Sequence, residues 1–275
     1  MIIVKNLDFK YKDKRIFHNL NFIIESGQWI SIIGENGSGK STLAKILTGL
    51  LQFQKGEILI NNFSLNEDNL IYLRSLIGII FQNPDYQFVG FDVRSDIAFG
   101  LENKKFQRSE ILEKIKKYSA MLGIEDLLYK KPQELSGGQK QKVSIASVLA
   151  MEPEIIIFDE PTAFLDPKGA KEIQNIIQNI HKQKNKILIT ITHDFSFALK
   201  SDKIMLLQEG FLLKYEKSHK FLKDFDFLYK FFPNLPLSLQ LYFLLFKDRK
   251  IDTQNKNKKF FNKLKDALWQ YILKM

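Results

Sequence analysis

Nine consecutive residues near the N-terminus combine the glycines and polar side chains that a phosphate-binding loop needs. They are Gly34, Glu35, Asn36, Gly37, Ser38, Gly39, Lys40, Ser41 and Thr42, which fit the pattern of Gly, any four residues, then Gly-Lys-Ser/Thr. Glycines let such a loop adopt positive φ angles and let phosphate oxygens approach the main-chain amides. In this interpretation Lys40 reaches the β- and γ-phosphates and the Ser41 hydroxyl binds Mg²⁺. The alternative is a chance glycine turn before a buried helix.

The segments on either side of the loop favour phosphate binding. Residues 29–33 are a short apolar run, as expected of a buried strand. The residues after the loop predict a helix, with Leu43, Ile46, Leu47 and Leu50 on one face. A strand, a glycine loop and a helix start together surround an anion with main-chain amides and the positive end of the helix dipole.

Length and composition indicate one large α/β domain with an appendage. The chain has 275 residues, of which 45% are hydrophobic and 26% are charged, as in an ordinary globular protein. It contains no cysteine, which excludes disulfides, zinc–thiolate sites and cysteine nucleophiles. The N-terminus does not resemble a signal peptide, and the longest apolar candidate, residues 235–246, is too short to span a membrane. If the protein works at a membrane, we expect another chain to cross it.

The positive charge is concentrated at the C-terminal end. The formal net charge is +10, and residues 211–275 hold 14 Lys and Arg against 6 Asp and Glu, so the first 210 residues carry only +2. This distribution argues against a nucleic-acid groove in the fold, and we expect no nucleic-acid partner. Residues 256–274 alternate lysines and apolar side chains at helical spacing, which predicts a basic amphipathic helix. Its apolar face is expected to pack on protein, and contact with an anionic membrane is the alternative.

Apolar runs and turn residues predict the order of the elements. An antiparallel meander is predicted at residues 2–4, 7–11 and 20–24, followed by a hairpin arm at 56–62 that turns at Asn61-Asn62. Buried strands are predicted at 77–81, 154–158 and 187–192, helices at 109–121 (opened by Ser109), 139–150 and 168–181, and a last hairpin at 203–214 about Glu209-Gly210. Because strands that alternate with helices pair in parallel, we expect an α/β fold with a helical insertion at about residues 84–152.

Four further motifs follow the glycine loop, each at the end of a strand or the start of a helix. Gln82 follows one predicted strand, Asp159-Glu160 ends another, and His193 ends the next; Ser136, Gly137, Gly138 and Gln139 open a helix. Each motif by itself has an ordinary explanation: a surface glutamine, a solvated acidic pair, a histidine with satisfied hydrogen bonds, or a serine N-cap.

Together with Tyr11, this order of motifs resembles the ATP-binding subunits of ABC transporters over about residues 1–215. The resemblance implies a P-loop NTPase core with a parallel sheet, an antiparallel β subdomain towards the N-terminus and the helical subdomain at about 84–152. It leaves residues 216–275 as a small, mostly helical C-terminal extension. It also implies an ATPase that uses ATP and Mg²⁺.

The resemblance assigns a role to each site residue. Asp159 holds Mg²⁺ together with Ser41 and Gln82. Glu160 accepts the proton of the attacking water, Gln82 orients that water, and His193 donates to the γ-phosphate beside Lys40. Tyr11 stacks on adenine, with a surface tyrosine of a hairpin as the alternative.

The resemblance also implies a head-to-tail dimer. Residues 136–139 resemble the signature loop that binds the γ-phosphate of ATP held by a second ABC ATPase subunit, either a paralogue or a second copy. Asp166 resembles part of the loop that couples the two sites.

Two segments narrow the resemblance to the energy-coupling-factor type, which drives uptake of vitamins or metal ions. They are residues 81–90 and 96–103, and they resemble most closely the first of the two paired ATPase paralogues. Residues 233–241 resemble the segment where the two ATPases touch. The implied partners are a transmembrane coupling protein and a substrate-binding membrane protein, so we expect a peripheral location on the cytoplasmic side of the cell membrane.

Two departures from this type stand in the middle of the chain. Arg94 and Ser95 replace residues that are usually acidic, but Asp92 and Asp96 remain, so we still expect a basic membrane partner. Lys142 replaces an arginine, which keeps the charge but loses the bidentate fork.

Three other functions are alternatives. One is the ATPase subunit of another ABC importer. Another is a soluble ABC ATPase without a transport role, although such proteins usually carry tandem halves or long coiled-coil insertions. The last is an inactive nucleotide sensor, against which the presence of Lys40, Glu160 and His193 argues.

Overall fold

The computed structural model describes residues 1–222 without a gap and, beyond them, residues 224, 227–228, 231, 237, 239–241 and 267–268. Most of the predicted dimer-contact segment at 233–241 and nearly all of the predicted amphipathic tail at 256–274 lie outside these residues. Among the described residues, no helix combines the length and the apolar character that spanning a membrane requires.

The N-terminal part forms a four-stranded antiparallel sheet in the order β2-β1-β4-β5, as predicted. Its strands are β1 (Ile2–Tyr11), β2 (Lys14–Ile24), β4 (Lys55–Ile60) and β5 (Phe63–Ser64). The first two predicted runs are one strand, because β1 continues through an irregularity in pairing at Asn6, whose φ is 49°. The turn at Asn61-Asn62 is confirmed, with φ angles of 50° and 68°.

The central sheet has six strands in the order β10-β9-β3-β8-β7-β6. The strands are β3 (Trp29–Ile33), β6 (Ile77–Ile80), β7 (Ile155–Asp159), β8 (Ile187–Ile191), β9 (Lys203–Gln208) and β10 (Phe211–Lys217). The pairs β3–β9, β3–β8, β8–β7 and β7–β6 are parallel, and β10 pairs antiparallel with β9 at the edge. Every residue of β3, β7 and β8 is buried, as expected of central parallel strands. The predicted parallel pairing is therefore confirmed.

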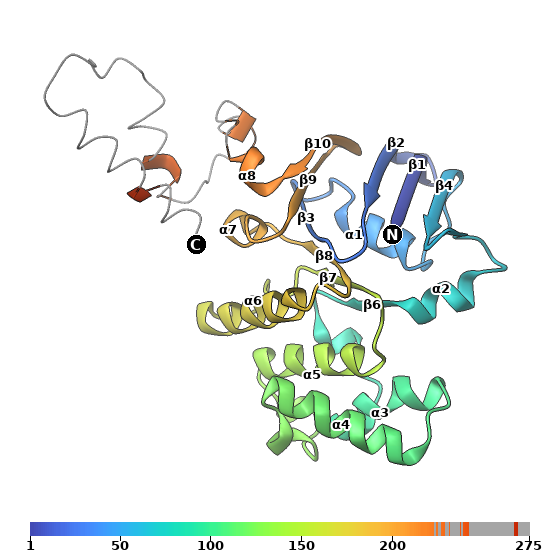
Figure 1. The fold of residues 1–275 in the computed structure, drawn as a ribbon, viewed down its shortest axis with the longest axis vertical. Helices are drawn as coiled ribbons and strands as arrows, with labels where there is room; N and C mark the ends of the chain where they lie inside the picture. Colours follow the sequence, from blue (N-terminus) through green and yellow to red (C-terminus); the bar gives the residue numbers. More distant parts are fainter. Residues whose placement is uncertain are drawn as a thin grey trace, which may run out of the picture.

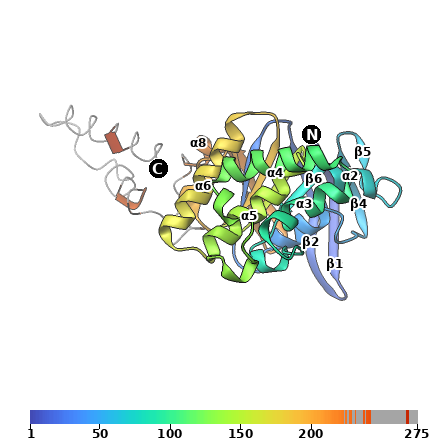
Figure 2. The ribbon, with the colours of Figure 1, turned by 90° about the horizontal axis from the view of Figure 1, so that it is seen from below.

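Helices cover the sheet on both faces. They are α1 (Lys40–Leu47), α2 (Leu70–Leu76), α3 (Val93–Asn103), α4 (Arg108–Leu122), α5 (Gly137–Ala150), α6 (Pro167–Lys182), α7 (Phe195–Ala198) and α8 (Ser218–Phe221). Alternate residues of the central strands point to opposite faces: Ile157 joins the core with α1 and the antiparallel sheet, whereas Phe158 joins the core with α3–α6. Figure 1 shows α3, α4 and α5 together as a layer beyond β6, and Figure 2 shows the same layer from below.

Two sequence predictions about helices are corrected. Leu50 lies beyond the end of α1 and is half exposed, so it does not belong to the buried face. α4 begins one residue before Ser109, because the side chains of Gln107 and Glu110 form a capping box at its N-terminus.

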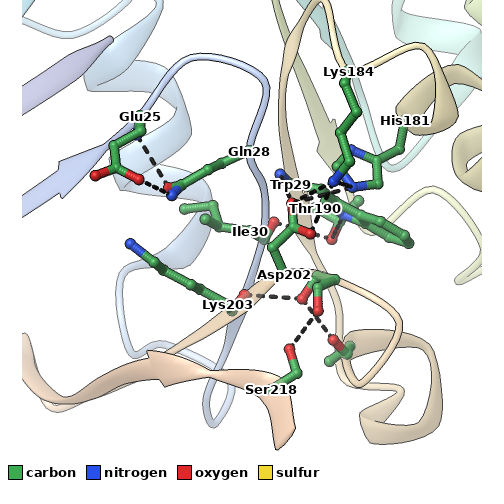
Figure 3. Close-up of polar contacts among 12 residues, drawn as sticks. Glu25, Gln28, Trp29, Ile30, His181, Lys184, Thr190, Asp202, Lys203 and Ser218 are labelled. Carbon is green, nitrogen blue, oxygen red and sulfur yellow. Dashed lines mark hydrogen bonds and ion pairs between the residues drawn. The ribbon is translucent and has the colours of Figure 1, made fainter. Parts of the chain in front are cut away.

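A polar cluster fixes the start of β3, the strand that leads into the glycine loop (Figure 3). Asp202 Oδ2 accepts a hydrogen bond from Trp29 N at 2.9 Å and lies 3.1 Å from His181 Nε2. The indole Nε1 of Trp29 donates to Thr190 Oγ1 on β8 at 3.0 Å. Burial would raise the pKa of Asp202, but the Trp29 amide and nearby cations hold that pKa below its usual value. The strand that carries the loop is thus bonded at its first residue.

Candidate functional site

The candidate site lies at the carboxyl edge of three adjacent strands. The glycine loop follows β3, Asp159-Glu160 ends β7, and His193 follows β8; β8 pairs with both β3 and β7. Carboxyl ends of parallel strands meet at one edge of a sheet, which is where open α/β folds bind ligands. The topology therefore brings together residues that are more than 100 positions apart in the chain.

The glycine loop needs its conformation, and at Gly39 it has little space around it. Gly39 adopts a φ of 102°, in the region that favours glycine, and is the N-cap of α1. A Cβ atom at this position would lie 2.5 Å from Cε1 of Phe17, so the antiparallel sheet presses directly on the loop. The oxygen Ser38 Oγ is buried and has no hydrogen-bond partner among the described residues. A buried donor of this kind is suited to an incoming acceptor such as phosphate.

Lys40 and Ser41 connect the loop to the acidic residues. The Lys40 ammonium donates to the carbonyl oxygens of Gly34 and Glu35, at 2.8 Å each. Ser41 Oγ donates to Asp159 Oδ1 at 2.9 Å. The predicted magnesium ligands Ser41 and Asp159 therefore lie in direct contact.

Burial shifts the pKa values of Lys40 and Asp159. Burial lowers the pKa of Lys40, and the carboxylates of Glu160 and Asp159 oppose that change. Burial also raises the pKa of Asp159, while the hydrogen bond from Ser41 opposes the increase. Both shifts indicate a partly dehydrated site in which an added phosphate or cation interacts strongly with the protein.

Glu160 and His193 form a hydrogen-bonded pair. His193 Nδ1 lies 2.8 Å from Glu160 Oε2, and the histidine side chain is 69% exposed whereas that of Glu160 is 11% exposed. Glu160 has a φ of 49°, which is unfavourable for a side chain of its size, and its N–H donates to Ile191 O at 3.0 Å. Strain of this kind, held in place by a neighbouring strand, is often found at functional sites.

Other predicted site residues lie apart from this cluster. Gln82 is exposed and lines a cavity of about 270 Å³ that also touches Gly137 and Leu165. Tyr11 lies at the end of β1, where its ring packs edge-on against Phe9 at 4.8 Å. Within the described part of the chain, no hydrogen bond or ion pair joins either of them to the glycine loop.

The predicted signature loop is a capped helix start on the surface. Ser136 is the N-cap of α5, and its capping box with Gln139 is complete. A Cβ atom at Gly138 would meet nothing within 4 Å, so this turn has room for a ligand. Asp166, the N-cap of α6, accepts from Gly169 N at 3.1 Å. No hydrogen bond or ion pair between described residues joins the signature loop to the glycine loop of the same chain.

The two acidic residues that led us to expect a basic partner are bonded within the chain. Asp96 is 6% exposed, and Asp92 is the N-cap of α3, with its carboxylate bonded to Ser95 N at 2.7 Å. Several apolar side chains of this region are exposed: Tyr86 is 82%, Val89 63% and Phe91 75% exposed. Acidic side chains followed by a helix also fit an N-cap and a buried carboxylate, and the sequence does not distinguish these from a charged surface.

Two residues that hold the site together carry no recognisable signal in the sequence. Phe17 packs on Gly39, and Asp202 binds Trp29 from 173 positions away. Lys142, which the sequence singles out as a lysine in place of an arginine, forms an ion pair with Glu172 on α6 at 2.9 Å. These contacts exist only once the sheets have been assembled.

Comparison with known proteins gives concordant matches. The profile of the ABC transporter family matches residues 17–163. An energy-coupling factor transporter ATP-binding protein EcfA of Aster yellows witches'-broom phytoplasma is 57% identical over 274 residues, covering 100% of both chains. EcfA1 of Mycoplasmopsis synoviae is 48% identical over 216 residues, which are 78% of this chain and 81% of that protein.

Solved structures have the same fold. One is cbiO1 from Clostridium perfringens, described as part of the ABC transporter complex cbiONQ; it has a TM-score of 0.76 and 34% identity and covers 87% of this chain and 97% of its own. Another is the ATP-binding cassette MJ0796 in a dimer bound to ADP and Pi, with a TM-score of 0.73 and 30% identity over 79% of this chain and 99% of its own.

Proposed function

Because the chain belongs to the ABC transporter family, and within it to the energy-coupling factor transporter ATP-binding proteins, we propose that the cluster at the carboxyl edge of β3, β7 and β8 is its ATPase site. The chain is an ATPase whose hydrolysis is coupled to transport. The observation that carries the assignment of the site is the convergence of Lys40, Ser41, Asp159, Glu160 and His193 on one edge of the sheet. The glycine loop binds the triphosphate through its amides, and Tyr11 stacks on the adenine.

The chemistry of hydrolysis follows from the paired residues. A water oxygen attacks the γ-phosphorus, the bond to the bridging β–γ oxygen breaks with its electrons going to ADP, and Glu160 accepts the proton of the water. Gln82 orients this water. His193 Nδ1 holds Glu160 Oε2 in place. Because a carboxylate only accepts hydrogen bonds, Nδ1 carries the hydrogen, and Nε2 donates to the γ-phosphate only when the ring is protonated.

Magnesium fits the donors that the site offers. Ser41 and Asp159 present two hard oxygen ligands side by side, and Mg²⁺ is usually bound by one or two such groups plus phosphates and water. Ser41, Asp159 and the amide oxygen of Gln82 would hold the ion. Bound there, Mg²⁺ neutralises charge on the β- and γ-phosphates.

A head-to-tail dimer completes each site. The signature loop, residues 136–139, is exposed at Ser136 and Gly137 and has no bond to the glycine loop of its own chain within the described residues. ATP then lies between the glycine loop of one chain and the signature loop of its mate, which is a paralogue or a second copy. The dimer of a 30% identical cassette bound to ADP and Pi supports this arrangement.

The dimer works on a membrane complex. The chain acts with a transmembrane coupling protein and a substrate-binding membrane protein to take up vitamins or metal ions, and it is peripheral on the cytoplasmic side of the membrane. The names of its relatives as energy-coupling factor transporter components support this proposal.

Replacing Glu160 by Gln tests the site. We expect the ATPase rate of the purified dimer or membrane complex to fall by ~10²–10³, while ATP-dependent pairing, followed by light scattering, persists. Glu154→Gln is a matched control, because Glu154 immediately precedes the first residue of β7, whereas Glu160 follows the last. Glu154→Gln should keep the rate within about twofold of the parent, since it changes the end of the strand that lies away from the site. A Glu160→Gln protein that hydrolyses ATP at the parent rate would rule out Glu160 as the base.

A further inference from the structure

The buried carboxylate of Asp96 joins three segments of the chain. Asp96 belongs to the first turn of α3 and is 6% exposed. Its Oδ1 accepts hydrogen bonds from the main-chain amides of Val89 at 2.9 Å and Gly90 at 3.1 Å. Its Oδ2 accepts from Ser147 Oγ on α5 at 2.9 Å. One side chain therefore binds the loop that follows Gln82 and the helix that begins at the signature loop.

The loop lies directly on α3 at this point. A Cβ atom at Gly90 would be 2.3 Å from Asp96 N and 2.6 Å from Asp96 Cα. Hydrogen bonds to an ionised acceptor are about twice as strong as neutral ones, so the two amide bonds fix the loop firmly. The loop cannot move away from α3 without leaving this carboxylate buried and short of donors.

The same loop carries exposed apolar side chains on its outer side. Tyr86, Val89 and Phe91 are 82%, 63% and 75% exposed. A second contact between loop and helix is less complete. Gln87 Nε2 donates to Ser144 O at 3.1 Å, but Gln87 Oε1 and Ser144 Oγ have no hydrogen-bond partner among the described residues. Asp96 thus provides the more fully bonded link between the apolar loop and α5.

The rigid helix carries this link to the signature loop. Ser147 lies ten residues after Gly137, the first residue of α5, which corresponds to ~15 Å of helix. Because the hydrogen-bonded helix moves as a unit, a displacement of the loop that reaches Ser147 also displaces residues 136–139.

We propose that Asp96 is a positioning residue that transmits contact at the apolar loop to α5, and so makes ATP hydrolysis respond to the membrane partner. The inference rests on the proposed function of the site. Asp96 touches no nucleotide in this scheme and acts through the position of the signature loop. Its role is coupling, so its loss should affect stimulation by the partner more than basal hydrolysis.

The test compares Asp96→Ala with Asp92→Ala. Asp92 caps α3, so its removal costs about 1 kcal/mol of stability but breaks no bond between the loop and α5. For each variant, ATPase activity is measured on the chain alone and in the co-purified membrane complex reconstituted in lipid vesicles. We expect the ratio of the two rates to fall at least about fivefold in Asp96→Ala, with basal activity within about twofold, and to stay within about twofold in Asp92→Ala.

Milder variants distinguish a loss of coupling from misfolding. Ser147→Ala removes one of the three bonds and should lower the ratio about twofold. Asp96→Asn keeps an oxygen that accepts from the two amides, so this variant should retain at least about half of the parent's ratio of the two ATPase rates. Because the chain has no cysteine, Phe91→Cys provides a single site for a spin label. The spin label should become more mobile when Asp96→Ala is added, and its mobility should not change when Asp92→Ala is added.

Three results would overturn the proposal. These are an unchanged ratio in Asp96→Ala, an equal fall in Asp92→Ala, or a basal loss that accounts for the whole effect. A parent complex that hydrolyses no ATP would instead refute the proposed function itself. The two failures are therefore distinguishable.

Discussion

Replacing Ser41 by alanine should destabilise the free protein, whereas replacing Ser38 by alanine should stabilise it. Ser41 Oγ donates to Asp159 Oδ1 at 2.9 Å, and Asp159 is 6% exposed. Removing that donor by Ser41→Ala costs about 1.5–3 kcal/mol, the value of a hydrogen bond to a charged group. Ser38 Oγ is buried with no partner among the described residues, so Ser38→Ala removes an unpaired polar group and should stabilise the free protein by up to about 1 kcal/mol.

Urea unfolding at pH 7 without nucleotide or Mg²⁺ measures both effects. The midpoints should shift in opposite directions at constant m-value. The Ser41→Ala deficit should shrink as the pH falls into the acidic range, because burial raises the pKa of Asp159 and, once that carboxyl is protonated, the lost bond is no longer charge-assisted.

Mg-ATP then separates stability from binding. Ligand at 100 times its Kd stabilises the parent by about 2.7 kcal/mol. Both variants should lose much of this increment, since in the proposed site Ser38 binds the phosphates and Ser41 binds the metal. Equal destabilisation by the two substitutions in the free protein, or full retention of the Mg-ATP increment by both, would refute the assignment of these hydroxyls.

Two further perturbations test the packing on the glycine loop and the ion pairs between α4 and Glu152. Gly39→Ala should destabilise the protein by about 2–4 kcal/mol and abolish ATP binding, because the substitution combines a φ of 102° with a Cβ atom 2.5 Å from the Phe17 ring. Unfolding curves measure the loss of stability and nucleotide titration measures the loss of binding. A loss of stability under about 1 kcal/mol would contradict this prediction. Glu152 binds Lys114, Lys117 and the Tyr118 hydroxyl, with the Lys114 bond first among the causes that lower its pKa to about 2. A depressed folded-state pKa gives stability that is complete above about pH 4.5 and is lost as the pH falls towards 2, so Glu152→Gln should cost about 1 kcal/mol at pH 7, after allowance for solvent screening, and almost nothing at pH 2. Equal costs at the two pH values would contradict this origin.

Local patterns were enough to predict most elements of the fold. The apolar runs that became β3, β7 and β8 are short, continuous and bounded by turn residues, and the glycine loop carries its conformational requirement in its own residue types. Element ends were less certain: a capping box at Gln107 starts α4 before Ser109, and Leu50 lies outside the buried helix face. Such ends depend on side-chain hydrogen bonds and on neighbouring elements that the periodicity does not contain.

The candidate residues were identified from the sequence, whereas their relation to one another depended on the tertiary structure. Residue types and order singled out Lys40, Ser41, Asp159, Glu160 and His193, since each stands where a strand ends or a helix begins. Only the strand order β3-β8-β7 places them at one edge and sets Ser41 against Asp159 and His193 against Glu160. The burial of Asp96, which the sequence shows only as an acidic residue compatible with a basic partner, was likewise decided by packing. A sequence records which groups are present, but the burial and pairing of a charge are properties of the assembled neighbours that exclude water from it.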